Sequence, residues 1–507
     1  MNKSPRRQST GSLFRKKPVS AILAEADSGD GDVLPSLKRT LGAWQLTMLG
    51  IGVVIGAGLF SLTGKVAADN AGPAVVFSYM ISGLACAFAG LCYAEFASSV
   101  PVAGSAYSYS YATMGELIAW IIGWDLVMEY AIGAGTVAVS WSAYFMKFCR
   151  QLNVDFPIQF ALSPFDHEVL SNGQQVQGIA NLPAAAIVVM MSLLLMRGTK
   201  ESAWFNSVMV ALKVTIVLLV IGLGWVYMNP ANHTPMIPAR LTEVLANGRT
   251  IYHFGWQGVL TGAGLIFFAY IGFDAVSTAA QEARNPQRDL PIGILGSLVI
   301  CTILYILFSW VITGLANYTE FRGVVDKLAP VATALSHMPP QFHWLQQLIV
   351  PAILCGFSSV IMVLLMGQSR VFITMSQDGL LPKFFSDIHP SRHTPWKSNG
   401  LFAVVVGAAV ALLPGNAFGE MCSVGTLLAF VLVCIGVIVL RYTQPDLPRK
   451  FRCPMVPLVP VLGAVSCLTM MAFLPKDTWW RLMVWMAVGL VIYFSYSRRH
   501  SRLGKGA

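Results

Sequence analysis

The sequence contains little charge and lacks the motifs of an enzyme or a metal site. Only 11% of its 507 residues are Asp, Glu, Lys or Arg, compared with about 25% in soluble proteins. Together with 55% hydrophobic residues and a mean hydropathy of +0.63, this excludes a single water-soluble core. The nine cysteines form no Cys-x-x-Cys pair or metal-ligand spacing, and no nucleophile–base pair or phosphate-binding loop is recognisable. We therefore expect neither an enzyme nor a protein that needs a metal or cofactor.

Long apolar segments recur along the chain after residue 42. About 20 apolar residues are enough for a helix to cross a bilayer, and twelve segments approach or exceed that length. They are 43–64, 73–98, 116–147, 178–197, 203–228, 255–282, 290–317, 346–376, 399–414, 423–441, 455–474 and 479–497. The sequence therefore predicts an all-α integral membrane protein with about twelve transmembrane helices.

The distribution of positive charge predicts how these helices are oriented. If the N-terminus is cytoplasmic, most of the 34 Lys and Arg residues fall in inner loops and in the two tails, 1–42 and 498–507. Inner loops of membrane proteins carry an excess of Lys and Arg, so we expect both termini in the cytoplasm. The net charge of +10 then reflects topology and not nucleic-acid binding, because the basic residues are spread over separate loops. No partner subunit is required, although Cys149, at the outer end of the third helix, could either tether one or simply pack.

Two apolar segments are interrupted by glycine in similar ways. The first, 50–60, reads GIGVVIGAGLF, and the second, 262–274, reads GAGLIFFAYIGFD. Glycine in a helix interior adds flexibility and removes packing, and unwound backbone in a bilayer must line a cavity or be buried in protein. Glycine breaks at matching positions of two halves point to a substrate site near the membrane midplane. The alternative is close helix packing, to which Gly56-Ala57-Gly58 is also suited.

The broken helices suit a zwitterionic ligand. A half-helix that starts after the first break has free N–H groups and a positive dipole end, which attract a carboxylate without a basic side chain. The residues expected at this group are Gly56, Ala57 and Gly58. An ammonium group would be bound by free carbonyl groups, for which the candidates are those of Val54, Phe268, Ala269 and Ile271. These groups together predict an α-amino acid site, which Phe268 and Phe273 could cover as gates, although aromatic residues in helices more often serve packing.

Lys213 is the one Lys or Arg near the centre of a predicted helix. A charged residue there is costly and should face the protein interior, where carbonyl or hydroxyl groups can bind it. Snorkelling to the interface is disfavoured, because about ten residues, roughly 15 Å of helix, lie on each side. We expect the ammonium group to replace a sodium ion between the first and eighth helices, with Ser358 and Ser359 as contacts.

Acidic residues also lie within the predicted helices. Glu129 is deep in the third helix and could face the pocket, and Asp274 directly follows the second break. Because burial favours the protonated form of a carboxyl group, either residue could couple transport to protons. For Asp274, structural pairing is an equal alternative. Glu95 and Glu282 lie near predicted cytoplasmic ends and could pair with basic residues of the loops.

These residues resemble a known family of transporters. Residues 52–60 are similar to the first helix of the amino acid–polyamine–organocation (APC) transporters, and 267–278 to the sixth helix of their cationic amino acid transporter branch. Further motifs between residues 38 and 452 fit the same branch in order. The resemblance implies a LeuT-like fold of two inverted five-helix repeats, 43–228 and 255–441, with helices one and six unwound. Two extra helices would follow, in 455–497.

The resemblance also implies roles for individual residues. Lys213 matches a helix-five lysine that takes the place of a sodium ion in proton-coupled members. Glu129 matches a glutamate that is associated with cationic substrates but also occurs in members that prefer neutral amino acids. At Ala57 the family often has Ser or Thr, so the backbone amides would have to hold the carboxylate alone. Twelve helices fit bacterial members, which implies the cell inner membrane.

We therefore predict a secondary active transporter, a permease that takes up L-amino acids with protons by alternating access. Mainly neutral substrates are favoured, because the motifs that form the pocket are apolar. Three alternatives stay open: an amino acid exchanger, a transporter specific for arginine and lysine, and a non-transporting sensor or interaction protein. Intramembrane charges argue against the last, since a scaffold would not need them.

Overall fold

The computed structural model describes residues 13–19, 22, 41–102, 104–169, 175–244, 250–280, 283–322, 330–392 and 394–505. Most of the predicted tail 1–42 lies outside these residues, as do Glu282 and the last two residues of the predicted tail 498–507.

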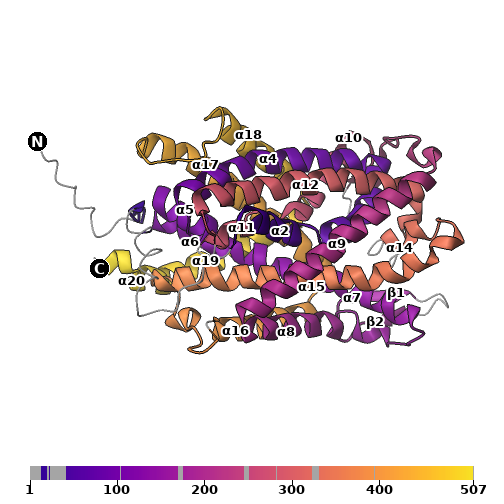
Figure 1. Cartoon of the computed structure of the whole chain (residues 1–507), viewed down its shortest axis with the longest axis horizontal. Coiled ribbons are helices and arrows are strands. Elements are labelled where there is room, and N and C mark those ends of the chain that lie inside the picture. The colour runs from indigo at the N-terminus through magenta and orange to yellow at the C-terminus, as the bar shows by residue number, and fades with distance from the viewer. Residues whose placement is uncertain are drawn as a thin grey trace, which may run out of the picture.

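Helices make up nearly all of the described chain (Figure 1). Within the part of the chain that the structure describes, eight helical stretches are long and apolar enough to cross a membrane, and three more apolar helices are shorter. The first stretch, Ala43–Ser99, covers the first two predicted segments, and every predicted segment falls on a helix. The α-helices are α2 (Ala43–Val54), α3 (Thr63–Val66), α4 (Val75–Ser99), α5 (Ser105–Thr113), α6 (Glu116–Val127), α7 (Gly133–Gln151), α8 (Leu182–Arg197), α9 (Thr199–Tyr227), α10 (Gly255–Ile266), α11 (Ala275–Thr278), α12 (Pro286–Leu315), α14 (Pro330–Leu335), α15 (His343–Gln377), α16 (Trp396–Leu412), α17 (Gly415–Thr443), α18 (Leu458–Ala472), α19 (Lys476–Ile492), α20 (Arg498–His500) and α21 (Arg502–Lys505).

Local sequence explains where some helices begin. The predicted segment 178–197 starts as a helix only at Leu182, because the side chain of Asn181 accepts a hydrogen bond from the N–H of Ala184 (3.2 Å) and Pro183 occupies the first turn. The helix predicted from residue 290 starts earlier, at Pro286, since proline is favoured in a first turn.

The chain is interrupted at both glycine-rich positions. Helix α2 ends at Val54, Ile55 is extended (φ −72°, ψ 100°), and a π-helical turn, η2 (Gly58–Leu62), follows. In the second segment, α10 continues as the 3-10 turn η8 (Phe267–Tyr270), after which Ile271 is extended. Gly272 then adopts φ +107°, a conformation that favours glycine, and a Cβ atom there would lie 2.2 Å from Val53 Cγ1.

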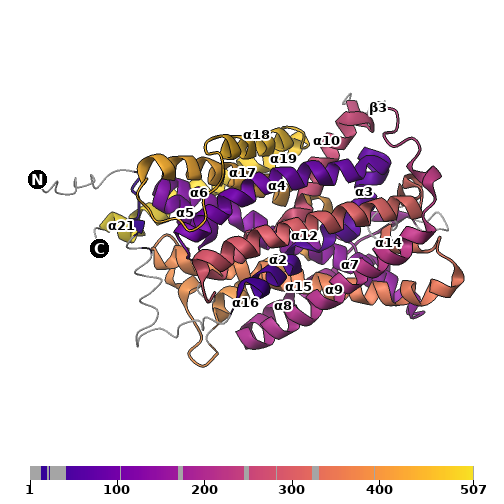
Figure 2. The same cartoon turned by 45° about the horizontal axis from the view of Figure 1, so that its top comes forward.

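The broken helices lie at the centre of the bundle. Helix α2 packs on α12, and α12 packs along α4, while α8 and α16 pair on the opposite side (Figures 1 and 2). Helices α17 and α18 pack together beside α4. This arrangement encloses the two interruptions in protein, which unwound backbone within a membrane requires.

The two ends of the described chain meet at the end of α15. Lys17 Nζ lies 2.6 Å from the carboxylate of Asp378, and the N–H of Arg502 donates to the Asp378 carbonyl (3.0 Å). Both ends of the described chain therefore lie on one side of the bundle.

Two short hairpins lie between predicted transmembrane segments. One pairs β1 (His167–Val169) with β2 (Gln175–Gln177), and the other pairs β3 (Leu241–Val244) with β4 (Thr250–His253). Their strands are only three or four residues long, too short for an alternating pattern to stand out in the sequence.

Candidate substrate site

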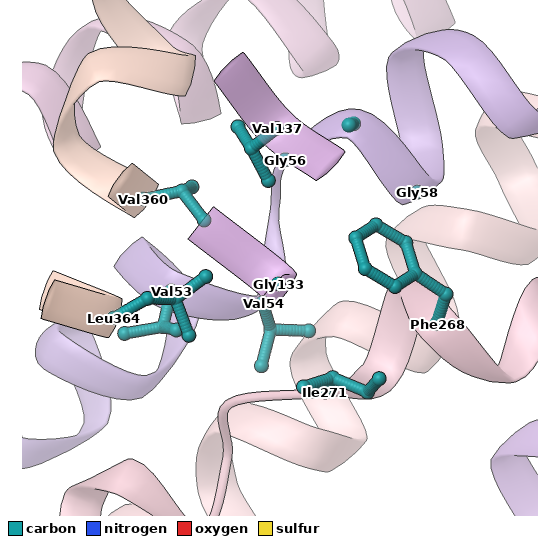
Figure 3. Close-up of a pocket in the computed structure, with 11 residues that line it drawn as sticks. Val53, Val54, Gly56, Gly58, Gly133, Val137, Phe268, Ile271, Val360 and Leu364 are labelled. Atoms are coloured by element: carbon teal, nitrogen blue, oxygen red, sulfur yellow. The ribbon is translucent and has the colours of Figure 1, made fainter. Parts of the chain in front are cut away.

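A small cavity lies between the two helix breaks (Figure 3). Its free interior volume is about 10 Å³, room for about one water molecule, so the helices around it must move apart to admit an amino acid. Its wall contains backbone of both interruptions and side chains from α2, α7, η8, the residue after η8, and α15. The lining residues are Val53, Val54, Gly56, Ala57, Gly58, Gly133, Val137, Phe268, Ile271, Val360 and Leu364. No charged side chain belongs to this lining, so the polar groups at the cavity come from the backbone.

The first break provides N–H groups at the cavity. Among the described residues, Gly56 and Ala57 donate no hydrogen bond to another backbone group, whereas Leu59 and Phe60 both donate to the Gly56 carbonyl (3.1 and 3.2 Å). The predicted carboxylate-binding residues Gly56, Ala57 and Gly58 all line the cavity. Free N–H groups at the start of a helical segment can hold an anion.

The glycines of this break have different surroundings. A Cβ atom on Gly56 would lie 3.1 Å from a methyl group of Val360, which is itself in the cavity wall. A Cβ atom on Gly58 would lie only 2.2 Å from the Cα atom of Ala269. Gly58 therefore allows η2 and η8 to pack closely, which is the close helix packing given above as the alternative reason for the glycines. Gly56 instead leaves space in the cavity.

Tyr305, in α12, contacts two of the predicted ammonium-binding carbonyls. Its hydroxyl oxygen lies 2.6 Å from the Val54 carbonyl oxygen and 2.8 Å from that of Ala269. The Phe268 carbonyl accepts from the N–H of Ile271 (3.2 Å). Phe268 and Ile271 face the cavity (Figure 3), whereas Ala269 is not part of its lining. Sequence analysis missed Tyr305, because a tyrosine in an apolar helix has the signature of packing.

Lys213 joins the end of α2 to α15. The side chain is 1% exposed, and its ammonium group donates to the carbonyls of Gly52 and Ile55 (3.0 Å for Ile55) and to Ser359 Oγ (3.0 Å). The expected contact with Ser359 is therefore present. Ser358 instead donates to the Leu354 carbonyl (2.8 Å) and accepts from the indole of Trp141 (3.2 Å), so its predicted contact with Lys213 is not formed.

Glu129 and Asp274 lie beside each other, and neither belongs to the cavity lining. Both are fully buried, and the hydroxyl of Tyr130 donates to Asp274 Oδ2 (2.7 Å). The two oxygen atoms of Glu129 have no hydrogen-bond partner among the described residues, and the Asp274 carboxyl group lies beside them. Glu129 belongs to a π-helical turn, η5 (Met128–Ile132), between α6 and α7. Such turns often occur at functional sites, and no feature of the sequence predicted this one.

Other predicted residues lie away from the cavity. Phe273 is absent from its lining and packs against Tyr93 and Phe430, with ring centroids 5.8 and 5.1 Å apart; it is therefore placed as a packing residue. Glu95 forms the expected ion pair with a loop residue, Arg449 (3.3 Å), and a second one with Arg441, in the last turn of α17 (2.7 Å). Cys149 is buried in the protein, 7% exposed, a position that suits packing better than a tether.

Comparison with known proteins identifies the family. Residues 41–493 match the family described as amino acid permease. The chain belongs to this family. It is 43% identical over 498 residues to the branched-chain amino acid permease BcaP of Bacillus subtilis, covering 98% of this chain and 100% of that one. It is 42% identical over 494 residues to the methylthioribose transporter of the same bacterium, with 97% and 100% covered.

More distant relatives include the cationic amino acid transporter branch that the sequence resembles. Cationic amino acid transporter 4 of Arabidopsis thaliana is 35% identical over 447 residues, which cover 86% of the permease and 68% of the plant protein. The resemblance to this family is thus confirmed. The permease is a multi-pass membrane protein of a transporter family and not an enzyme.

Proposed function

We propose that the protein takes up L-amino acids with uncharged, apolar side chains, driven by protons and by alternating access. The observation that carries this proposal is the cavity between the two helix breaks, which combines backbone polar groups with an apolar wall. The substrate carboxylate binds the N–H groups at Gly56 and Ala57. The ammonium group binds the carbonyls of Val54 and Ile271, whose residues line the cavity, and that of Ala269, which is outside the lining but shares the Tyr305 hydroxyl with Val54. No side-chain charge is needed for either contact.

The wall of the cavity favours aliphatic side chains. Val137, Val360 and Leu364 offer only hydrocarbon surface, and Phe268 lies across from them (Figure 3). A charged side chain placed there would lose its hydration without gaining a partner. The similarity to a branched-chain amino acid permease supports the same class of substrate.

We assign proton coupling to Lys213, with Asp274 and Glu129 as the buried acids beside the site. The ammonium group of Lys213 ties α2 to α15 where a sodium ion would otherwise be needed, so transport requires no sodium. Loss of its proton would release α2 from Ser359 and favour opening of the cavity on one side. The repeats 43–228 and 255–441 supply the two halves that move, in the cell inner membrane with both termini in the cytoplasm.

The competition test described below also distinguishes two other transport activities. Glu129 could select cationic amino acids if its carboxylate reached the substrate, but it is outside the cavity lining. An exchanger would transport the same substrates without net accumulation. A sensor without transport is disfavoured by the buried charge of Lys213.

The test is a competition panel with purified protein in proteoliposomes, with labelled leucine as the substrate and an inward proton gradient. Leucine, isoleucine and valine should compete well, whereas arginine, lysine, leucinamide and methylthioribose should not. Stronger competition by arginine or lysine would reverse the choice of substrate charge. Preferred binding of methylthioribose, which has neither a carboxylate nor an ammonium group, would overturn the proposed site chemistry.

A further inference from the structure

The hydroxyl of Tyr305 links the two broken helices directly. It lies between the carbonyl of Val54, the last residue of α2, and the carbonyl of Ala269 in η8, at 2.6 and 2.8 Å. Tyr305 is fully buried, and its ring is held by those of Tyr79 and Tyr270, each with a centroid 5.3 Å away. The hydroxyl position is therefore fixed by packing and not by chance contact with a mobile side chain.

One hydroxyl faces two acceptors. A tyrosine hydroxyl carries a single proton. It can therefore donate to the Val54 and Ala269 carbonyls only one at a time, or through one hydrogen bond shared between them. Buried carbonyl groups without a donor are costly, and two of them facing each other would also repel. The ammonium group of an amino acid carries three N–H donors and suits the same acceptors, as argued above for the substrate.

We propose that Tyr305 is a positioning residue that stands in for the substrate's ammonium group when the carrier is empty. This inference rests on the proposed amino acid transport. With substrate bound, the ammonium group supplies the donors that let α2 and η8 approach each other. Without substrate, the Tyr305 hydroxyl supplies one donor, so that the empty carrier can also close and return across the membrane.

The consequence concerns net transport and exchange. Net uptake requires the empty carrier to close and return, whereas exchange of substrate for substrate uses only the loaded carrier. Without the Tyr305 hydroxyl, the loaded carrier still has the substrate's ammonium group to donate to the Val54 and Ala269 carbonyls. The empty carrier has no donor for these two carbonyls. Tyr305→Phe is therefore expected to turn a net transporter into an exchanger.

The experiment compares two rates in proteoliposomes for each protein. Net uptake of labelled leucine is measured into empty vesicles under a proton gradient, and exchange is measured into vesicles preloaded with unlabelled leucine at equal pH. For Tyr305→Phe we expect net uptake to fall about tenfold relative to exchange, which corresponds to about 1.4 kcal/mol. An equal fall in both rates, or no change in either, would overturn the proposal.

Tyr270→Phe is the matched control. Its hydroxyl donates to the Tyr79 carbonyl (2.9 Å) in the same aromatic cluster and contacts neither Val54 nor Ala269, so its removal should not change the ratio of the two rates. The wild-type protein gives a second test that needs no variant to fold. It must show net uptake, and obligate exchange by the wild type would contradict the role given to Tyr305. Absence of both activities in the wild type would instead refute the proposed function.

Discussion

Alanine substitution of Gly56 and Gly58 separates a binding role from a packing role. The Cβ atom of Gly58→Ala would lie 2.2 Å from the Ala269 Cα atom and 2.9 Å from its nitrogen. These are backbone atoms, so η8 would have to move by over an ångström. Such overpacking costs about 3 kcal/mol or more, and we expect the variant to lose much of its folded yield.

Gly56→Ala meets a softer neighbour. Its Cβ atom would lie 3.1 Å from Val360 Cγ2, and a side-chain methyl group can yield by the few tenths of an ångström required. The cost to stability should be below about 1.5 kcal/mol. The added methyl group lies in the cavity beside the N–H groups proposed for the carboxylate, so leucine affinity should fall about tenfold, or about 1.4 kcal/mol.

The assay combines thermal unfolding of the purified variants in detergent with competition binding of leucine. Gly222→Ala in α9 serves as the control, because a Cβ atom there meets nothing within 4 Å. Its leucine affinity should match the wild type, and its unfolding temperature should not fall, since alanine is favoured over glycine within a helix. The reasoning is refuted if Gly56→Ala binds leucine with unchanged affinity, or if Gly58→Ala unfolds at the wild-type temperature.

Three further predictions concern side chains. Ser359→Ala removes a hydrogen bond of the buried Lys213 ammonium group, worth about 1.5–3 kcal/mol. Proton-driven leucine accumulation should fall about tenfold in Ser359→Ala and change less than about twofold in Ser358→Ala. Equal effects of the two substitutions would contradict the assignment of Ser359 as the partner of Lys213. Glu129→Gln should keep leucine competition within about threefold, because the carboxylate lies outside the cavity lining; loss of leucine binding would place Glu129 at the substrate. Arg441→Gln leaves the buried carboxylate of Glu95 with Arg449 (3.3 Å) and the N–H of Cys453 (2.8 Å) as its partners. It should destabilise the protein by about 2 kcal/mol, seen as a lower unfolding temperature; an unchanged temperature would show that the ion pair with Arg441 is dispensable.

The helices and the two breaks could be predicted from the sequence because their signals are strong. Apolar segments near 20 residues have few folds open to them in a membrane, and glycine within such a segment is unfavourable unless it serves a purpose. Lys213 could be given a partner for the same reason, since a buried ammonium group must find carbonyl or hydroxyl oxygens. The carbonyl of Gly52, close to the first break, accepts one of its hydrogen bonds.

Features that depend on helix rotation could not be predicted. Ser358 and Ser359 are neighbours in sequence but point about 100° apart on a helix, so the sequence alone did not show which one faces Lys213. Phe273 directly follows the second break, yet it turns toward Tyr93 and away from the cavity. Tyr305 lies far along the chain from both breaks, and only the packing of α12 on α2 reveals its contact with them.

The central claim, proton-driven amino acid uptake that depends on Lys213, is tested most directly by leucine accumulation in proteoliposomes without sodium. The wild type should concentrate labelled leucine under an inward proton gradient and lose this accumulation when a proton ionophore is added. Lys213→Met keeps a side chain of similar length without the charge, so it should bind leucine but fail to concentrate it. A requirement for sodium in the wild type, or full proton-driven accumulation by Lys213→Met, would contradict the account.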